Sequence, residues 1–240
     1  MGCLCEQLAG KDIRVTSTCI GNLWIFKDLK QEEMVALAGG ASRNVYEAGQ
    51  TIFMQGDLAD EMFLIKAGRV KLSKVTEDGA EITLDLRKAG DFLGENMLSE
   101  DIDYPVTAWC MEKTLICGFT KAQFEKIVFE HPNIGLQVIK NLSSRISWLT
   151  NRVGSMSLTH LEERLYGVLV SVAREHGSKG PKGLVIQFPL THEDLSFLVG
   201  AHRVSITRAM KNLKESGKIV QEGKTLTLPI ENLQCIMGSW

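Results

Sequence analysis

Arginine and lysine side chains gather in one short stretch near the C-terminal end of the chain. Residues 203–224 carry six basic residues against the two acidic residues Glu215 and Glu222. A guanidinium group pairs bidentately with a phosphate or with the acceptor edge of guanine, and lysine adds a mobile point charge. The chemistry that this stretch offers is therefore the binding of a polyanion.

The spacing of these side chains predicts the element that must position them. A helix over residues 203–216 would carry on one face Arg203, Thr207, Lys211 and Lys214. Its other face would be apolar, with Ile206, Met210 and Leu213. We expect the first face to meet the polyanion and the second to pack on a core; the alternative is a solvated charged face on an ordinary surface helix.

The flanking residues predict a second helix and a hairpin around this one. Thr191 followed by Asp194 is typical of a helix N-cap, and that first helix stops at Gly200. Gly217 is the predicted C-cap of the helix over residues 203–216. The chain then turns back at Glu222-Gly223, while "LVIQFPL" before the first helix is expected to be an edge strand broken by Pro189.

Two short helices followed by a hairpin are typical of a winged helix-turn-helix that binds the DNA major groove. The residues we predict to contact DNA are His202, Arg203, Val204, Ser205, Thr207, Arg208 and Lys211.

The residues from Val45 to Phe119 form short apolar runs separated by glycines. Two alternating runs meet at Asp78-Gly79, a pair that favours a tight hairpin. This segment is expected to be a small antiparallel barrel or sandwich. The loop of residues 90–95 then carries Gly94 and Glu95, where backbone amides can approach a ligand closely.

A long amphipathic helix is expected from about residue 135 to residue 157. Its apolar residues recur at spacings of 3, 4, 3, 4 and 3: Ile139, Leu142, Ile146, Leu149, Val153 and Met156. So narrow and regular a seam favours a helix that pairs with its own copy in a parallel homodimer. The alternative is a helix packed on its own barrel.

Composition bounds the class of protein. The 240 residues carry a net charge of -2, yet residues 159–240, with ten basic and eight acidic side chains, carry +2. No apolar run approaches the length of a membrane span and no secretion signal begins the chain, so we expect a cytoplasmic protein with no membrane partner. No nucleophile motif, metal-ligand cluster or phosphate-binding loop predicts an enzyme.

Three stretches together resemble the Crp/Fnr family of bacterial transcription regulators: "VTEDGAEITLDLRKAGDFLGE", the seam helix and "GAHRVSITRAMKNLKESG". The resemblance implies an α+β chain with an N-terminal cyclic-nucleotide-binding-type antiparallel β-barrel or jelly roll, a long central dimerisation helix and a C-terminal winged helix-turn-helix. The implied parts are an N-terminal arm (1–22), an effector-sensing domain (23–132), a dimerisation helix (133–157) and a DNA-binding domain (158–240). A palindromic DNA site and RNA polymerase are the implied partners.

The family's branches differ in what they sense. The cyclic-AMP branch carries an Arg-Ser pair before an Ala-Trp dipeptide, whereas this chain has Val106 and Thr107 before Ala108-Trp109, which argues against cyclic AMP. In the oxygen-sensing branch four cysteines hold an iron-sulfur cluster, and Cys3, Cys5, Cys19 and Cys117 lie in the matching regions. Their spacing departs from that branch, so a cluster, a redox disulfide and small buried thiols stay open, as does haem-based gas sensing.

The chain most resembles the CprK-type halorespiration regulators, which bind chlorinated phenolic compounds and activate dehalogenation genes. The resemblance sets Arg145 where those proteins use a lysine to hold the phenolate. A salt-bridged arginine of the long helix is the alternative role. The implied effector is a small molecule, with a halogenated aromatic as one candidate, bound allosterically between barrel and central helix by Gly94, Glu95, Thr107, Arg145 and Trp148.

The same resemblance bears on the DNA sequence that is read. Val204 stands where many relatives carry a glutamate that reads a base. Valine offers only an apolar contact, such as one with a thymine methyl group. We therefore expect an A/T-rich half-site.

Overall fold

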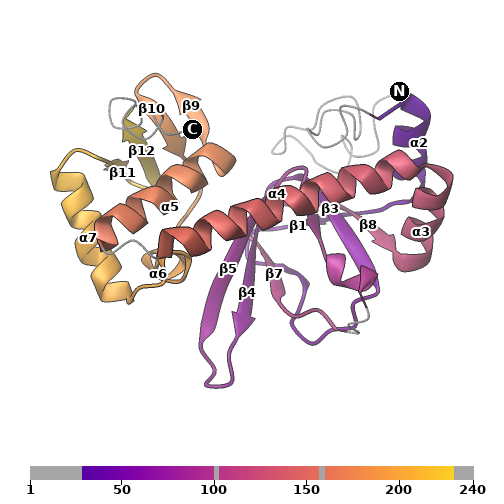
Figure 1. Cartoon of the computed structure of the whole chain (residues 1–240), viewed down its shortest axis with the longest axis horizontal. Helices are drawn as coiled ribbons and strands as arrows, with labels where there is room; N and C mark the ends of the chain where they lie inside the picture. The colour runs from indigo at the N-terminus through magenta and orange to yellow at the C-terminus, as the bar shows by residue number, and fades with distance from the viewer. Residues whose placement is uncertain (1–28, 100–102, 157–159, 230–240) are drawn as a thin grey trace. The chain divides into compact units, whose positions relative to one another are not determined.

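The computed structural model describes residues 29–99, 103–156 and 160–229, except for the side chains of residues 151, 152, 155 and 156. The chain divides into two compact units, one ending at Ile146 and the other beginning at Ser147. The elements of the two units are labelled in Figure 1.

The first unit is built on two antiparallel four-stranded sheets. One sheet has the strand order β1-β8-β3-β6, and the other has the order β2-β7-β4-β5. The bounds of their strands are β1 Ser42–Tyr46, β2 Thr51–Phe53, β3 Glu61–Ala67, β4 Arg69–Val75, β5 Glu81–Lys88, β6 Phe92–Leu93, β7 Thr107–Cys110 and β8 Thr114–Thr120.

One apolar core joins the two sheets. It brings Phe63 and Ile65 of β3 together with Val70 of β4 and Ala108 of β7. Because the two sheets face each other across this core without pairing into one continuous ring of described strands, the predicted barrel is a jelly roll of two open sheets. The predicted antiparallel fold is confirmed.

The predicted hairpin at Asp78-Gly79 joins β4 to β5. Gly79 has a φ of 82°, a conformation that residues with a Cβ rarely adopt, and its amide donates to the Thr76 carbonyl over 2.9 Å. The two strands pair from Val75 with Glu81 to Arg69 with Lys88. The turn thus sets the register of the strand that carries Asp85 and Arg87.

Helices complete the first unit, and they are α2 Gln31–Gly40, the 3-10 turn η2 Glu95–Leu98, α3 Lys121–Glu130 and α4 Pro132–Met156. The first part of α4 packs on the jelly roll through residues spaced 4, 3 and 4 apart: Ile134, Val138, Asn141 and Arg145. Ile134 and Val138 join an apolar cluster with Phe124 and Ile127 of α3. A helix of 25 residues therefore has one face fixed to its own sheet domain.

The second unit begins on the last turns of α4. Its further elements are α5 Leu161–His176, β9 Ser178–Gly180, β10 Gly183–Ile186, α6 His192–Val199, α7 Arg203–Glu215, β11 Val220–Glu222 and β12 Thr225–Pro229. The strands form one sheet in the order β11-β12-β10-β9. Two helices and the β11–β12 hairpin give the predicted winged helix-turn-helix.

The strand expected from "LVIQFPL" differs from the prediction in its bounds and place. β10 ends at Ile186, three residues before Pro189, and it pairs with both β9 and β12. The edge position was therefore a wrong expectation. Proline lacks the amide that a strand pairing on both sides needs, and the strand avoids the conflict by ending before Pro189.

Candidate nucleic-acid interface and effector site

Helix α7 separates its side chains into a buried and an exposed face. The buried residues are Ile206, Ala209, Met210 and Leu213. Val204, Thr207, Arg208 and Lys211 lie on the exposed face, and Val204 keeps 54% of its surface in contact with solvent. Val204 is thus an exposed apolar side chain on the first turn of a helix whose exposed face also carries Arg208 and Lys211.

The predicted DNA-contact residues lie together on this helix. Arg203 is exposed at its first turn, and Ser205 is half-buried on one flank. His202 is the N-cap residue, and its Nδ1 accepts a hydrogen bond from the Val204 amide over 3.4 Å. His202 therefore fixes the start of the helix, beside the side chains predicted to read bases.

Helix α6 holds α7 in place through a tight turn. Thr191 caps α6 and receives the Asp194 amide on its Oγ1 over 3.0 Å, as the sequence predicted. Gly200 ends the helix with a φ of 69°, the left-handed conformation that glycine adopts without strain. His192, the first residue of α6, contacts α7 directly: its Nδ1 lies 3.0 Å from Thr207 Oγ1.

Carboxylates of the same unit pair with the polar side chains of α7. Glu193 lies 3.4 Å from Arg203, and Glu215 lies 3.7 Å from Lys211. The first pair is well exposed, so its contribution to stability is small. Because both pairs are exposed, Arg203 and Lys211 can exchange these carboxylates for the phosphates of a polyanion.

A pocket of about 540 Å³ borders one flank of α7. Ser205, Arg208 and Asn212 of α7 line it together with Glu162 and Lys218. Asn212 donates a hydrogen bond of 2.5 Å to Glu162 across it. Arg208 therefore belongs both to the exposed face of α7 and to the lining of this pocket.

The predicted effector residues of the first unit each have an internal partner. Gly94 has a φ of 74°, and a Cβ there would meet the Glu61 carbonyl oxygen at 2.6 Å. Glu95 accepts a hydrogen bond from Arg87 Nη2 over 3.1 Å. The hydroxyl of buried Thr107 accepts from the Gln55 amide over 3.0 Å. The side chains of Glu95 and Thr107 are therefore both engaged in hydrogen bonds within the first unit.

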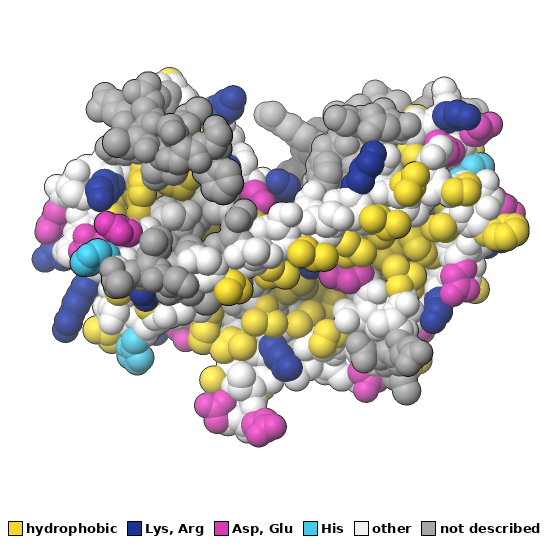
Figure 2. Space-filling view, in the orientation of Figure 1, with side chains coloured by type: hydrophobic (Ala, Val, Ile, Leu, Met, Phe, Trp, Pro, Cys, Tyr) yellow, Lys and Arg dark blue, Asp and Glu magenta, His cyan; other side chains and the backbone are white. Residues whose placement is uncertain are grey.

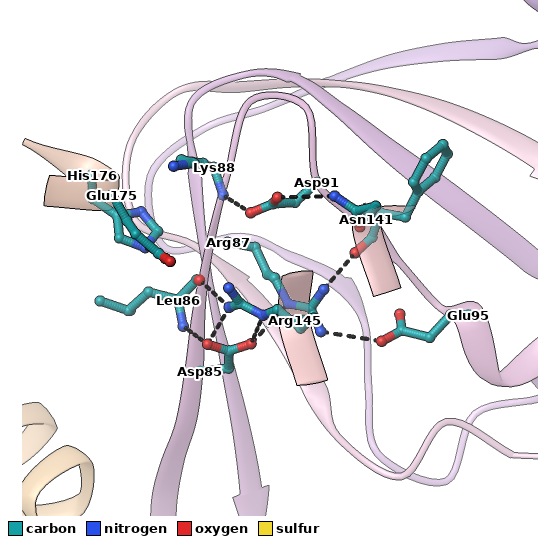
Figure 3. Close-up of polar contacts among 11 residues, drawn as sticks. Asp85, Leu86, Arg87, Lys88, Asp91, Glu95, Asn141, Arg145, Glu175 and His176 are labelled. Atoms are coloured by element: carbon teal, nitrogen blue, oxygen red, sulfur yellow. Dashed lines mark hydrogen bonds and ion pairs between the residues drawn. The ribbon is translucent and has the colours of Figure 1, made fainter. Parts of the chain in front are cut away.

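Arg145 forms a buried ion pair rather than pointing to solvent. Its Nε donates to Asp85 Oδ2 over 2.6 Å, and its Nη2 donates to the Leu86 carbonyl over 2.6 Å and lies against Asp85 Oδ1. Figure 3 shows the guanidinium groups of Arg145 and Arg87 near the Asp85 carboxylate. Arg87 is the second, with Nε 2.9 Å from Asp85 Oδ2.

The polar cluster around Arg145 includes four residues that the sequence analysis did not identify as site residues: Asp85, Arg87, Asp91 and Asn141. Asn141 donates weakly to Asp91 Oδ1 over 3.4 Å, and its own Oδ1 is buried without a hydrogen-bond partner among the described residues. Asp85 and Arg87 in the alternating strand "EITLDLRK" were the available signal, because a charge on the buried side of a strand needs a partner. Trp148, the remaining predicted effector residue, is half-buried on the part of α4 that belongs to the second unit.

The cysteines fall into two groups. Cys117 lies on β8 in an apolar cluster that includes Leu64 and Phe119. Cys110 is a buried free thiol, and burial raises its pKa to about 11. Cys3, Cys5 and Cys19 lie outside the described residues. Within the parts of the chain that are described, no three acidic, histidine or cysteine side chains are grouped to hold a metal ion.

The seam of α4 is exposed on the single chain. Solvent contacts 58% of Ile139, 64% of Ile146, 43% of Leu149 and 66% of Val153. Leu142 is half-buried, and the side chain of Met156 lies outside the described ones. Figure 2 shows hydrophobic side chains following this helix in a band. The helix therefore uses one face for its own domain and leaves the seam uncovered.

Both halves of the chain match family models. Residues 43–131 match the cyclic nucleotide-binding domain, and residues 163–236 match the Crp-like helix-turn-helix domain. With both models in this order on a jelly roll and a winged helix-turn-helix, the chain belongs to the Crp/Fnr family of transcription regulators, as the sequence predicted. No helix among the described segments has the length and apolar character of a membrane span.

Named relatives agree with this assignment. The global nitrogen regulator of Synechococcus elongatus is 29% identical over 185 residues, which cover 76% of this chain and 83% of the relative. The fumarate and nitrate reduction regulatory protein of Salmonella typhimurium is 24% identical over 223 residues, covering 92% of this chain and 89% of the relative. Such relatives are transcription regulators, so this chain is a regulator and not an enzyme.

Solved structures share the fold. The c-di-GMP responsive regulator CLP of Xanthomonas campestris matches 83% of this chain and 99% of its own, at 20% identity and a TM-score of 0.70. CprK in complex with OCPA matches 86% of this chain and 94% of its own, at 17% identity and a TM-score of 0.64. The likeness to CprK is thus one of fold, with other family members matching at higher TM-scores.

Proposed function

We propose that the protein is a homodimeric, sequence-specific DNA-binding regulator whose helix α7 enters the major groove. The observation that carries the proposal is the exposed face of α7, where Val204 lies among Thr207, Arg208 and Lys211. Arg203 and Arg208 contact bases and phosphates, and Ser205, Thr207 and Lys211 support them. His202, as the N-cap, positions the first turn at the backbone.

The half-site is A/T-rich in this proposal. Val204 can contact a thymine methyl group but can neither donate nor accept a hydrogen bond. Because its side chain is 54% exposed and lies on the first turn of α7, it is placed to approach a base edge. A thymine opposite Val204 is the expected base.

Dimerisation through the α4 seam accounts for apolar side chains that the single chain leaves in water. Four seam residues are more than two-fifths exposed, and covering a large aliphatic side chain contributes about 1.5–3 kcal/mol. A second copy of α4 supplies the same surface. Two symmetric recognition helices then match half-sites about 34 Å apart, so the DNA site is palindromic.

Control by a small molecule is the second part of the proposal. The proposed effector residues are Gly94, Glu95, Thr107 and Arg145 of the first unit, together with Trp148 on the part of α4 that belongs to the second unit. The effector acts only by binding two arrangements of the protein with different affinity. An anionic effector that pairs with Arg145 must replace Asp85, a buried partner, so its binding and the position of α4 are coupled.

The chemical class of the effector is inferred from the sequence around Val106 and from the resemblance to CprK-type regulators. Val106 stands where the cyclic-AMP branch has its phosphate-binding arginine, which argues against cyclic AMP. A halogenated aromatic is supported by the resemblance of the sequence to CprK-type regulators. The redox and iron-sulfur alternatives draw no support from Cys117, which is buried among apolar side chains. RNA polymerase is the proposed protein partner, and the proposed location is the cytoplasm; activation and repression of transcription both fit the proposal.

The proposal is tested by selecting binding sites from a random pool of duplexes, with and without candidate halophenols. We expect the wild type to enrich a palindrome, and the Arg208→Gln variant to lose affinity for it. Lys179→Gln removes the same charge on β9 and serves as the control. Equal binding by both variants and the wild type would show that α7 is not the DNA-contacting helix.

A further inference from the structure

His192, at the start of α6, contacts the recognition helix through a hydrogen bond whose direction can be worked out. Thr207 Oγ1 donates its single hydrogen to the Arg203 carbonyl over 3.1 Å. Towards His192 Nδ1, 3.0 Å away, the same oxygen can therefore only accept. In the tautomer that this arrangement favours, the proton of the neutral imidazole is on Nδ1 and Nε2 carries a lone pair.

The charges around this ring disfavour a second proton in the free protein. Burial, followed by the charges of Lys214 and Arg203 on α7, lowers the pKa of His192. Glu193 and Asp194 are the neighbouring carboxylates on its own helix, but Glu193 pairs with Arg203 and Asp194 accepts from Thr191. The imidazole is therefore neutral near neutral pH.

The first helix of a helix-turn-helix crosses the DNA backbone when the second lies in the major groove. His192 is the first residue of α6 and is half-buried against α7, so in this arrangement it lies at the phosphates that flank the groove. A lone pair on Nε2 repels a phosphate oxygen, whereas a protonated Nε2 donates a charge-assisted hydrogen bond to it. Phosphate contact therefore selects the protonated ring.

We propose that His192 is a phosphate-binding residue and that it takes up one proton for each half-site bound, with Thr207 holding its Nδ1. This inference rests on the proposed entry of α7 into the major groove. The partner is a DNA phosphate, and the consequence is a regulator whose affinity for DNA depends on pH.

The sign of the dependence follows from linkage. The phosphate raises the pKa of His192 in the complex above its lowered value in the free protein. The affinity for DNA is greatest below the pKa that His192 has in the free protein. It falls as the pH rises to the pKa that His192 has in the complex. Between these two values the dissociation constant increases up to about tenfold per pH unit for each half-site.

The test measures binding of a short random-sequence duplex at low salt, by fluorescence anisotropy, between about pH 5.5 and pH 8, where an imidazole titrates. His192→Gln retains a neutral donor, and His192→Arg carries a permanent charge. His131→Gln changes an imidazole of the first unit, at the end of α3, and serves as the control. Circular dichroism confirms that each variant is folded.

We expect a pH-dependent affinity for the wild type and for His131→Gln, and a flat profile for His192→Gln. His192→Arg should bind at every pH about as tightly as the wild type does at the acidic end. A wild-type slope that persists in His192→Gln, or that disappears in His131→Gln, would overturn the assignment. If the wild type binds no duplex at any pH, the proposed function itself fails, which is a distinguishable result.

Discussion

Replacing Asp85 by asparagine should destabilise the first unit about twice as much as replacing its partner Arg145. The Asp85 carboxylate lies against Arg145 and Arg87, and it also accepts from the Leu86 amide over 2.8 Å. All three charged residues are at most 9% exposed. Asparagine removes the negative charge and turns an N–H toward guanidinium groups that can only donate.

The structure gives the order of the effects. Breaking a buried ion pair by removing one partner costs about 3–5 kcal/mol, because the remaining charge is stranded. After Asp85→Asn, Arg87 still has Glu95, so most of the loss arises at Arg145 and we expect about 3 kcal/mol. After Arg145→Met, Asp85 keeps Arg87 and the Leu86 amide, and we expect about half of that loss.

The assay is urea unfolding of the full chain followed by circular dichroism, with the transition of the first unit fitted separately. The double variant carrying both changes should be more stable than Asp85→Asn alone, since it also removes the guanidinium group that has lost its carboxylate partner. A loss below about 1 kcal/mol for Asp85→Asn, as exposed pairs give, would refute the reasoning that this carboxylate holds two buried cations.

Two further predictions concern the seam and the interface. Ile146→Asp should convert the proposed dimer to a monomer in analytical ultracentrifugation. The control Ser144→Asp, an exposed position on the opposite face of α4, should stay dimeric. A dimeric Ile146→Asp would place the interface elsewhere. Glu193→Gln removes a negative charge beside Arg203. The repulsion between that carboxylate and a DNA phosphate at a separation of about 7 Å in water is worth about 0.6 kcal/mol. The affinity of this variant for random-sequence duplex at low salt should rise roughly threefold, and an unchanged affinity would contradict a place for Arg203 at the DNA.

The parts of the fold that sequence predicted are those fixed by local patterns. Thr191 and Gly200 cap α6 because a hydroxyl and a left-handed residue are needed at those ends. The exposed and buried faces of α7 follow from its spacing, and the exposed seam of α4 follows in the same way. Each of these features is set within a few turns of one helix.

The parts that sequence did not predict depend on residues far apart in the chain. Arg145 meets Asp85 across 60 positions, so nothing near either residue indicates the other. Asn141 and Asp91 are likewise brought together only by the packing of α4 on the sheets. The barrel face of α4 was offered as an alternative to self-pairing, whereas the helix has both a barrel face and a free seam. The contact of His192 with Thr207 needs the turn between two helices to be known.

The central claim, that the exposed face of α7 reads bases in the major groove, is tested most directly by changing Val204 to glutamate and repeating the site selection. A glutamate carboxylate accepts a hydrogen bond from the amino group of cytosine. The account predicts that a single symmetric position of the half-site changes from thymine to cytosine while the flanking positions are kept. An enriched site identical to that of the wild type would contradict it.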